Sequence, residues 1–171
     1  DWQRAADLGD VESARWLPAA STDAPVPSST TRLPVARPVV VASTSLVGFN
    51  AAVRATPKNA SLYFKRANYY LSQGDLVKAL ADYNRSIELD PAFAKALNNR
   101  GVVRRRLSDL KGAMADYSAV IRLNPRDADA YQNRGIVNEQ MGRLPAACSD
   151  WGVAAGLGSV EARQWIAGQC Q

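Results

Sequence analysis

The chain has 171 residues, of which 47% are hydrophobic and 22% are charged, and its formal net charge is +5. This composition is typical of a folded protein and argues against global disorder. The sequence contains no histidine, which excludes Ser-His and Cys-His catalysis, histidine metal sites and a histidine pH switch. No run approaches the roughly 18 apolar residues that suggest a membrane-spanning helix.

The N-terminal segment resembles the C-terminal end of the same chain. Residues 1–17 align without gaps with residues 150–166, with two tryptophans in matching places. We therefore expect residues 1–17 to be a helical remnant that ends an earlier array, with further repeats before residue 1 in a longer product. The alternative is a short helical pair that packs on residues 45–56, and the two interpretations are compatible. Because no basic and apolar leader follows Asp1, we also expect a mature or trimmed chain.

Residues 18–44 are rich in Pro, Ser, Thr and Ala, and four prolines lie between positions 25 and 38. Proline interrupts a regular helix, so an extended linker is predicted. The apolar segment 35–49 at its end either lies along the chain's own repeats or adds itself to a partner surface.

From residue 45 the sequence follows a 34-residue period, which is the mark of a repeat protein. Residues 45–58 contain the second half of one unit and predict a single helix at 45–56. Three full units follow over residues 59–158. In the first of them, the apolar spacing predicts antiparallel helices over 60–73 and 76–89.

Three kinds of residue recur at fixed places in the units. Small residues recur where the two helices of a unit should cross, and these are Ala67, Gly101, Gly135, Ala79, Ala113 and Ala147. Large aromatic side chains beside them are predicted to fill the core, and these are Tyr83, Tyr117 and Trp151. An arginine and an aspartate also recur, and the predicted structural pairs are Arg66 with Asp82, Arg100 with Asp116, and Arg134 with Asp150.

The last segment, residues 159–171, is predicted to contain a short amphipathic helix that covers the apolar edge of the third unit. A disulfide between Cys148 and Cys170 is favoured over two independent thiols. It would imply an oxidising compartment, such as the periplasm or a lumen, although the localisation is otherwise unknown. Two cysteines without histidine argue against a zinc site.

Over residues 60–158, this order of large, small and proline positions resembles the tetratricopeptide repeat. The resemblance implies an all-α fold, a right-handed α-solenoid of helix hairpins with a C-terminal capping helix. Arg104 and Asn138 stand where the family usually has a tyrosine, and Ser159 replaces a closing proline, which we expect to loosen the later units. The Asn-Arg-Gly openings resemble bacterial, and especially cyanobacterial, members.

In this family the first helix of each unit lines a concave groove that binds a partner. The positions that the resemblance assigns to partner binding are Lys65, Asn68, Lys95, Asn98, Asn99, Arg105, Arg106, Gln132 and Asn133. Ser72, Asp129 and Glu139 share that face. Amide side chains suit this place because they offer both a donor and an acceptor to a peptide backbone. The alternative is that they are ordinary surface residues.

One group within the family binds the C-terminal carboxylates of chaperones through three cationic side chains. Here Asn68 and Asn99 match that pattern, but Phe64, Asp129 and Asn133 occupy the cation positions. A carboxylate needs charged donors, so we expect this chain not to bind such tails.

A basic cluster without acidic residues lies between positions 94 and 107, and it consists of Lys95, Arg100, Arg104, Arg105 and Arg106. It is interpreted as a solvated helix face, a surface for an acidic protein, or a site for nucleic acid or lipid headgroups.

We expect a non-catalytic scaffold that binds a protein or peptide segment, acidic partners included, in the assembly of a larger complex. Relatives in photosynthetic and envelope biogenesis make a membrane or photosynthetic complex one option. The alternatives are a nucleic-acid-binding helical repeat and a regulatory domain of an enzyme. No cofactor, metal or small-molecule substrate is expected.

Overall fold

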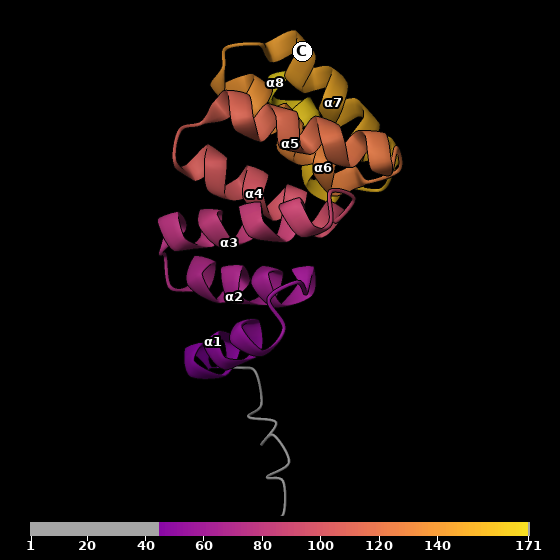
Figure 1. Ribbon diagram of the computed structural model, residues 1–171. Coiled ribbons are helices and arrows are strands. Elements are labelled where there is room, and N and C mark those ends of the chain that lie inside the picture. The colour runs from indigo at the N-terminus through magenta and orange to yellow at the C-terminus, as the bar shows by residue number, and fades with distance from the viewer. Residues whose placement is uncertain (1–44, 171) are drawn as a thin grey trace, which may run out of the picture. The chain divides into compact units, whose positions relative to one another are not determined.

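The computed structural model describes residues 45–170, which lie in one compact unit. The helical remnant predicted at 1–17 and the linker predicted at 18–44 lie outside the described residues. Within the described part the chain forms eight helices and no strand, and the helices follow one another through the stack in chain order (Figure 1). None of these helices is long and apolar enough to cross a bilayer.

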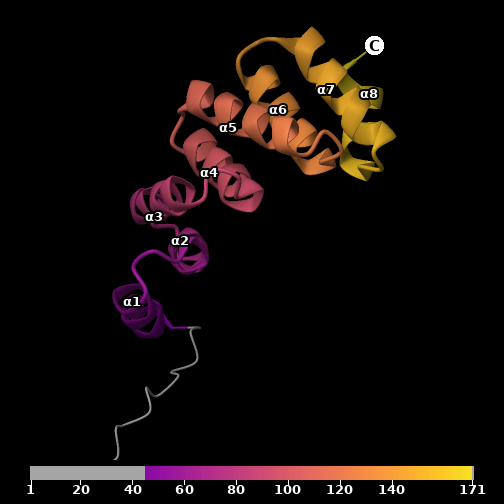
Figure 2. The same ribbon diagram turned by 45° about the vertical axis from the view of Figure 1, so that its right-hand side comes forward.

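The helices are α1 (Leu46–Ala55), α2 (Ala60–Ser72), α3 (Leu76–Leu89), α4 (Ala94–Arg106), α5 (Leu110–Leu123), α6 (Ala128–Gln140), α7 (Leu144–Gly156) and α8 (Val160–Gln169). The pairs α2 and α3, α4 and α5, and α6 and α7 form three hairpins, which Figure 2 shows from a second direction. Helix α1 precedes them as a single helix and packs on α2. The first helices of the hairpins are thus α2, α4 and α6.

Capping side chains define where most helices begin. In six of the eight helices a side chain accepts a hydrogen bond from a backbone N–H of the first turn, which otherwise lacks a partner. These residues are Ser45, Asn59, Asp75, Asp109, Asp127 and Ser159. Helix α7 instead has Pro145 in its first turn, where the missing N–H costs nothing.

The turn inside each hairpin uses a left-handed backbone conformation. Gly74 and Gly142 have φ angles of 76° and 73°, and Ser108 takes the same place with φ 64°. Glycine adopts this region without a steric penalty, whereas serine does not. The second hairpin therefore makes the same turn as the other two at a higher conformational cost.

The core lies where the helices of a hairpin cross, as the sequence predicts. Ala67, Ala79 and Ala113 are fully buried beside the aromatic rings. A Cβ at Gly101 would come within 2.7 Å of the Tyr117 ring, so this crossing has no room for a larger residue. The small residues are required because the aromatic side chain of the second helix fills the space above the first.

The last helix closes the array. Helix α8 lies within the predicted segment 159–171 and packs Trp165 against Trp151, with ring centroids 5.3 Å apart. A disulfide joins Cys148 on α7 to Cys170 after α8, with Cα atoms 5.7 Å apart. The apolar edge of the third hairpin is therefore both covered and covalently connected to its cover.

Candidate functional site

The three predicted arginine–aspartate pairs are present and each is bidentate. In the first hairpin, Arg66 Nε donates to Asp82 Oδ2 over 2.7 Å and Arg66 Nη2 donates to Asp82 Oδ1 over 2.8 Å. Arg100 with Asp116 and Arg134 with Asp150 repeat this geometry. The aspartates are buried, so the pairs connect the two helices of each hairpin beneath the surface.

Each of these arginines also reaches back to the preceding unit, which the sequence analysis missed. The Nη1 atom donates to Asn50 in the first case, to Asn84 in the second and to Ser118 in the third. The acceptors recur 34 residues apart, one per unit, and this period was the signal that could have revealed them. One side chain thus stabilises both a hairpin and its contact with the hairpin before it.

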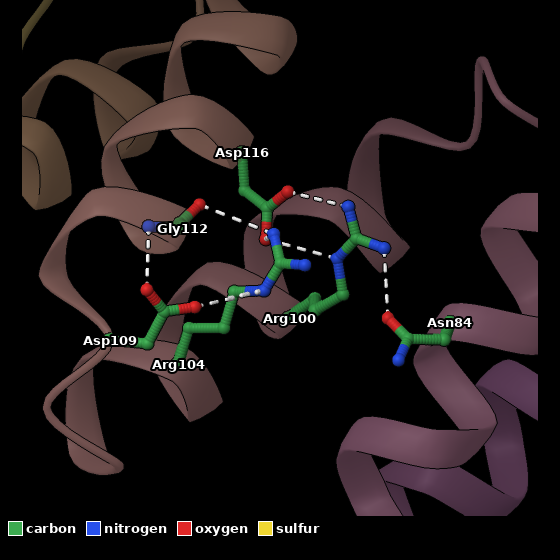
Figure 3. Close-up of polar contacts among 6 residues, drawn as sticks. All are labelled: Asn84, Arg100, Arg104, Asp109, Gly112 and Asp116. Atoms are coloured by element: carbon green, nitrogen blue, oxygen red, sulfur yellow. Dashed lines mark hydrogen bonds and ion pairs between the residues drawn. The ribbon is translucent and has the colours of Figure 1, made fainter.

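In the second unit the buried aspartate has a second cation (Figure 3). Arg104 Nη1 lies 2.9 Å from Asp116 Oδ2 and also donates to the backbone oxygen of Gly112 over 3.3 Å. Arg104 Nε lies 3.6 Å from Asp109 Oδ2. Arg104 therefore does not belong to a free basic surface, because its charge is directed into the hairpin.

Asn138 occupies the corresponding place in the third unit. Its Nδ2 donates to Asp150 Oδ2 over 3.0 Å, and the residue is buried. Both Arg104 and Asn138 add a polar contact to the buried aspartate of their own unit, which argues against the expectation that they loosen the later units.

Amide side chains connect the first helices to one another. Asn99 on α4 donates from Nδ2 to Asn68 Oδ1 on α2 over 2.9 Å. Asn133 on α6 donates in the same way to Asn98 Oδ1 over 3.3 Å. Gln132 Oε1 accepts from the Ser159 hydroxyl over 2.6 Å. These half-buried amides therefore use part of their bonding capacity within the protein, and the remaining donors and acceptors are available at the surface.

A cleft of about 230 Å³ lies among the first helices. It is lined by Phe64, Ala94, Lys95, Asn98, Asn99, Asp127 and Asp129. Phe64 also packs on Phe93, with ring centroids 4.9 Å apart, so one wall is aromatic and held in place. This cleft brings together Lys95, Asn98 and Asn99 from the predicted set.

The other predicted residues do not line the cleft. Lys65 and Arg106 are exposed, and Asn68, Arg105, Gln132 and Asn133 are half-buried. Asp127 lines the cleft but was not predicted to do so. Its Oδ1 accepts a hydrogen bond from the backbone N–H of Ala130, and this capping role alone accounts for an aspartate at the position. The pairing of Phe64 with α4 depends on the stacking of the hairpins, which no local motif encodes.

A buried hydroxyl distinguishes the second unit. Tyr83 donates to Asn68 Oδ1 over 2.5 Å, but Val102 replaces this asparagine one unit later, and within residues 45–170 the hydroxyl of Tyr117 has no hydrogen-bond partner. Burial raises the pKa of Tyr83 and of Tyr117 to about 12, and the nearby charge of Arg105 partly opposes the rise at Tyr117.

A second, more open depression of about 810 Å³ lies at the loops before α2 and α4. It is lined by Thr56, Pro57, Lys58, Asn59, Ala60, Ser61, Asp90 and Phe93. None of the predicted partner-binding residues lines it, and it is open to solvent over much of its extent. The smaller cleft is the better candidate site because it is lined by residues of α2 and α4 and of the start of α6, and includes three of the predicted partner-binding residues.

Stacked helical hairpins of this kind define an α-solenoid repeat protein. A family model described as "TPR repeat" matches residues 67–108 and 103–142, and a second model, "Tetratricopeptide repeat", matches residues 49–81. The chain belongs to the tetratricopeptide repeat family.

Comparisons with individual proteins agree with this assignment. The chain is 40% identical over 55 residues to the Hsp70-Hsp90 organizing protein of Triticum aestivum, which covers 32% of this chain and 10% of that protein. It is also 40% identical over 53 residues to the Protein SGT1 homolog of Oryza sativa subsp. japonica, and this match covers 31% of this chain and 14% of that protein. The matches therefore span only a small part of these relatives.

Two solved structures show the same fold. MamA matches with a TM-score of 0.67 and 23% identity over 70% of this chain and 71% of that chain. The first TPR of Spaghetti (RPAP3), bound to the HSP90 peptide SRMEEVD, matches with a TM-score of 0.63 and 24% identity over 67% and 92%.

Proposed function

We propose that this chain is a non-catalytic adaptor that binds a segment of a partner protein along α2, α4 and α6. The observation that carries the proposal is the cleft of about 230 Å³, where Phe64 lies beside two amides and three charged side chains. A cleft of this size accepts a side chain of a partner, and the neighbouring amides suit its backbone. The bound peptide in the Spaghetti structure supports this use of the fold.

A chaperone tail is a poor occupant of this cleft. Its terminal carboxylate would approach Asp129, whose negative charge would repel it, while Phe64 and Asn133 supply no cation. The proposed partner segment is therefore not of the carboxylate-terminated type, although it is bound by the same row of helices.

Nucleic acid is also disfavoured. Arg100 and Arg104, two of the five cations in the basic cluster, bind the buried Asp116. Fewer free charges remain for phosphates, which dominate the affinity of proteins for nucleic acid.

For the setting, we propose assembly of a larger complex in an oxidising compartment, a periplasm or a lumen. The disulfide between Cys148 and Cys170 supports this choice, since such bonds are rare in reducing compartments. A membrane-associated or photosynthetic complex fits the proposal.

The proposed function is tested by affinity capture of the tagged full chain from its source, with mass spectrometry of the proteins that co-purify. The groove variant K65A/K95A removes two exposed cations of the first helices that form no ion pair within residues 45–170. The control K111A/R122A removes two exposed cations from α5. We expect the groove variant to lose partners that the control retains. Equal recovery with both variants would contradict a role for the groove.

A further inference from the structure

We infer that the groove along α2, α4 and α6 selects a partner segment that carries both signs of charge, with an acidic residue opposite α4 and a basic residue opposite α6. This inference rests on the proposed function. The reason is a reversal of charge between neighbouring first helices. At one repeat position Lys95 on α4 is followed by Asp129 on α6, and at another Arg105 is followed by Glu139. Equivalent places in consecutive units thus carry opposite charges.

These charges are not neutralised inside the protein. Within residues 45–170, Lys95, Asp129, Arg105 and Glu139 form no ion pair. Lys95, Asp129 and Glu139 are exposed, whereas Arg105 is half-buried, with its Nε atom enclosed and its charge beside the Tyr117 hydroxyl. Lys95 is therefore the free cation that carries the argument on α4. By contrast, Arg134 on α6 is directed to Asp150, so it does not offset the acidic residues beside it. At these repeat positions, the charge that no ion pair neutralises is therefore positive on α4 and negative on α6.

The cleft shows that the two signs meet at one place. Lys95 and Asp129 line the same volume of about 230 Å³ and do not approach each other within ion-pair distance. Packed helices lie about 10 Å apart, a distance that about three residues of extended chain span. A segment crossing the groove would therefore meet the two charges about three residues apart.

The acidic part of the groove is narrow. One repeat after Asp129, α8 carries the exposed Arg163. The negative charge at this repeat position is therefore confined to α6. Phe64 lies on the other side of α4 from α6 and offers an apolar contact to the same segment. The chemistry that fits is an apolar residue, then an acidic one, then a basic one. A uniformly acidic segment would place a carboxylate against Asp129, and a uniformly basic one would place an ammonium against Lys95.

Three fluorescent peptides of equal length test the inference by anisotropy at about 50 mM salt, where surface charges are weakly screened. All contain one leucine and neutral spacers. The first carries two Glu and, three residues later, two Lys; the second carries only Glu at these places, and the third only Lys. We expect the mixed peptide to bind at least about fivefold more tightly than either of the others, as expected for one mismatched surface pair.

The variant D129K reverses the charge on α6, and we expect it to prefer the all-Glu peptide over the mixed one. Because Asp129 lies in the first turn of α6, where a cation is unfavourable, circular dichroism melting accompanies the titrations. D129N serves as a milder variant, and we expect it to reduce the preference for the mixed peptide without inverting it. The control E88K reverses an exposed carboxylate on α3, outside the cleft, and should leave the order unchanged.

Several results would overturn the inference. The wild-type chain could bind the all-Glu peptide as tightly as the mixed one, bind none of the three, or keep its preference in folded D129K. A dimer in light scattering that dissociates in D129K would show that a second copy occupies the groove. Loss of captured partners in K65A/K95A with no effect of D129K on the peptide order would reject the charge rule and leave the adaptor role standing.

Discussion

At the residue scale, one repeat position shows how neighbouring residues decide what a buried polar atom contributes to stability. Tyr83, Tyr117 and Trp151 fill equivalent places, but their polar atoms differ in partner. Tyr83 donates to Asn68, and Trp151 donates to the backbone oxygen of Gln132. The hydroxyl of Tyr117 has no hydrogen-bond partner within the described helices. The two tyrosine rings are equally well buried, so the hydrogen bond to Asn68 is what distinguishes Tyr83 from Tyr117 in partner.

This difference predicts unequal outcomes for the same substitution. Y83F removes a hydrogen bond and leaves Asn68 with one bond fewer, so we expect a loss of about 1 kcal/mol in the free energy of unfolding. Within residues 45–170 the Tyr117 hydroxyl makes no hydrogen bond of good geometry and has only the charge of Arg105 nearby, so we expect Y117F to cost less than Y83F. Urea denaturation of both variants checks this, and a larger loss for Y117F than for Y83F would contradict it.

The buried ion pairs give a second prediction. R66A leaves Asp82 without a cation, whereas R100A leaves Asp116 with Arg104. An unpaired buried charge is costly, so we expect R66A to lower the free energy of unfolding by about 3 kcal/mol and R100A to lower it by less. Both variants should change partner affinity less than stability. Thermal melts and partner capture measure the two effects, and a variant that melts normally but loses its partner would contradict the structural role.

At the scale of helices and hairpins, the sequence predicts most of what is observed. A fixed period places equivalent residues in equivalent surroundings, so the hairpins, the small crossing residues and the recurring Arg–Asp pairs follow from one unit. Contacts that break the period do not follow. Arg104 binds Asp116 at a place where the first unit has Tyr70 and the third has Asn138, and no repeated pattern indicates its partner.

The candidate site was predictable only in part. The sequence placed Lys95, Asn98 and Asn99 on the first helices, and the cleft brings them together. It did not show that Asn68 already bonds to Asn99, because this contact depends on how two hairpins stack. The angle between hairpins arises from packing along the whole array, and no segment of the sequence contains it.

The closing helix provides a prediction at this scale. The disulfide between Cys148 and Cys170 spans 22 residues and includes all of α8. Closing a loop of this length restricts the unfolded chain, so we expect its reduction to lower the free energy of unfolding by about 3 kcal/mol. Hydrogen exchange with and without reductant locates the effect. Faster exchange should appear first in α8, and a uniform increase over all hairpins would contradict a local closing role.

At the scale of the whole described unit, the two buried tyrosines predict sensitivity to alkali. Burial raises the pKa of Tyr83 and Tyr117 to about 12, whereas a tyrosine in an unfolded chain has a pKa of about 10. Above the lower value the unfolded state loses protons that the folded state keeps. Stability is therefore fully present below about pH 10 and falls as the pH rises toward 12.

Urea unfolding at a series of pH values between about 9 and 11 measures this decline. The double variant Y83F/Y117F lacks both titrating hydroxyls and serves as the control, so its stability should fall less steeply over the same range. An identical slope in the wild-type chain and the double variant would show that other groups govern the alkaline transition.

The backward reach of Arg66, Arg100 and Arg134 limits how freely the units can be exchanged. Each guanidinium requires a polar oxygen in the preceding unit, supplied by Asn50, Asn84 and Ser118. A unit transplanted behind a foreign neighbour would keep its internal aspartate but would need a matching acceptor at the junction. Two units of this chain are therefore compatible when the arginine of one finds a polar acceptor sixteen residues earlier in the other. Helix α1 carries Asn50 and supplies this acceptor to the first full hairpin.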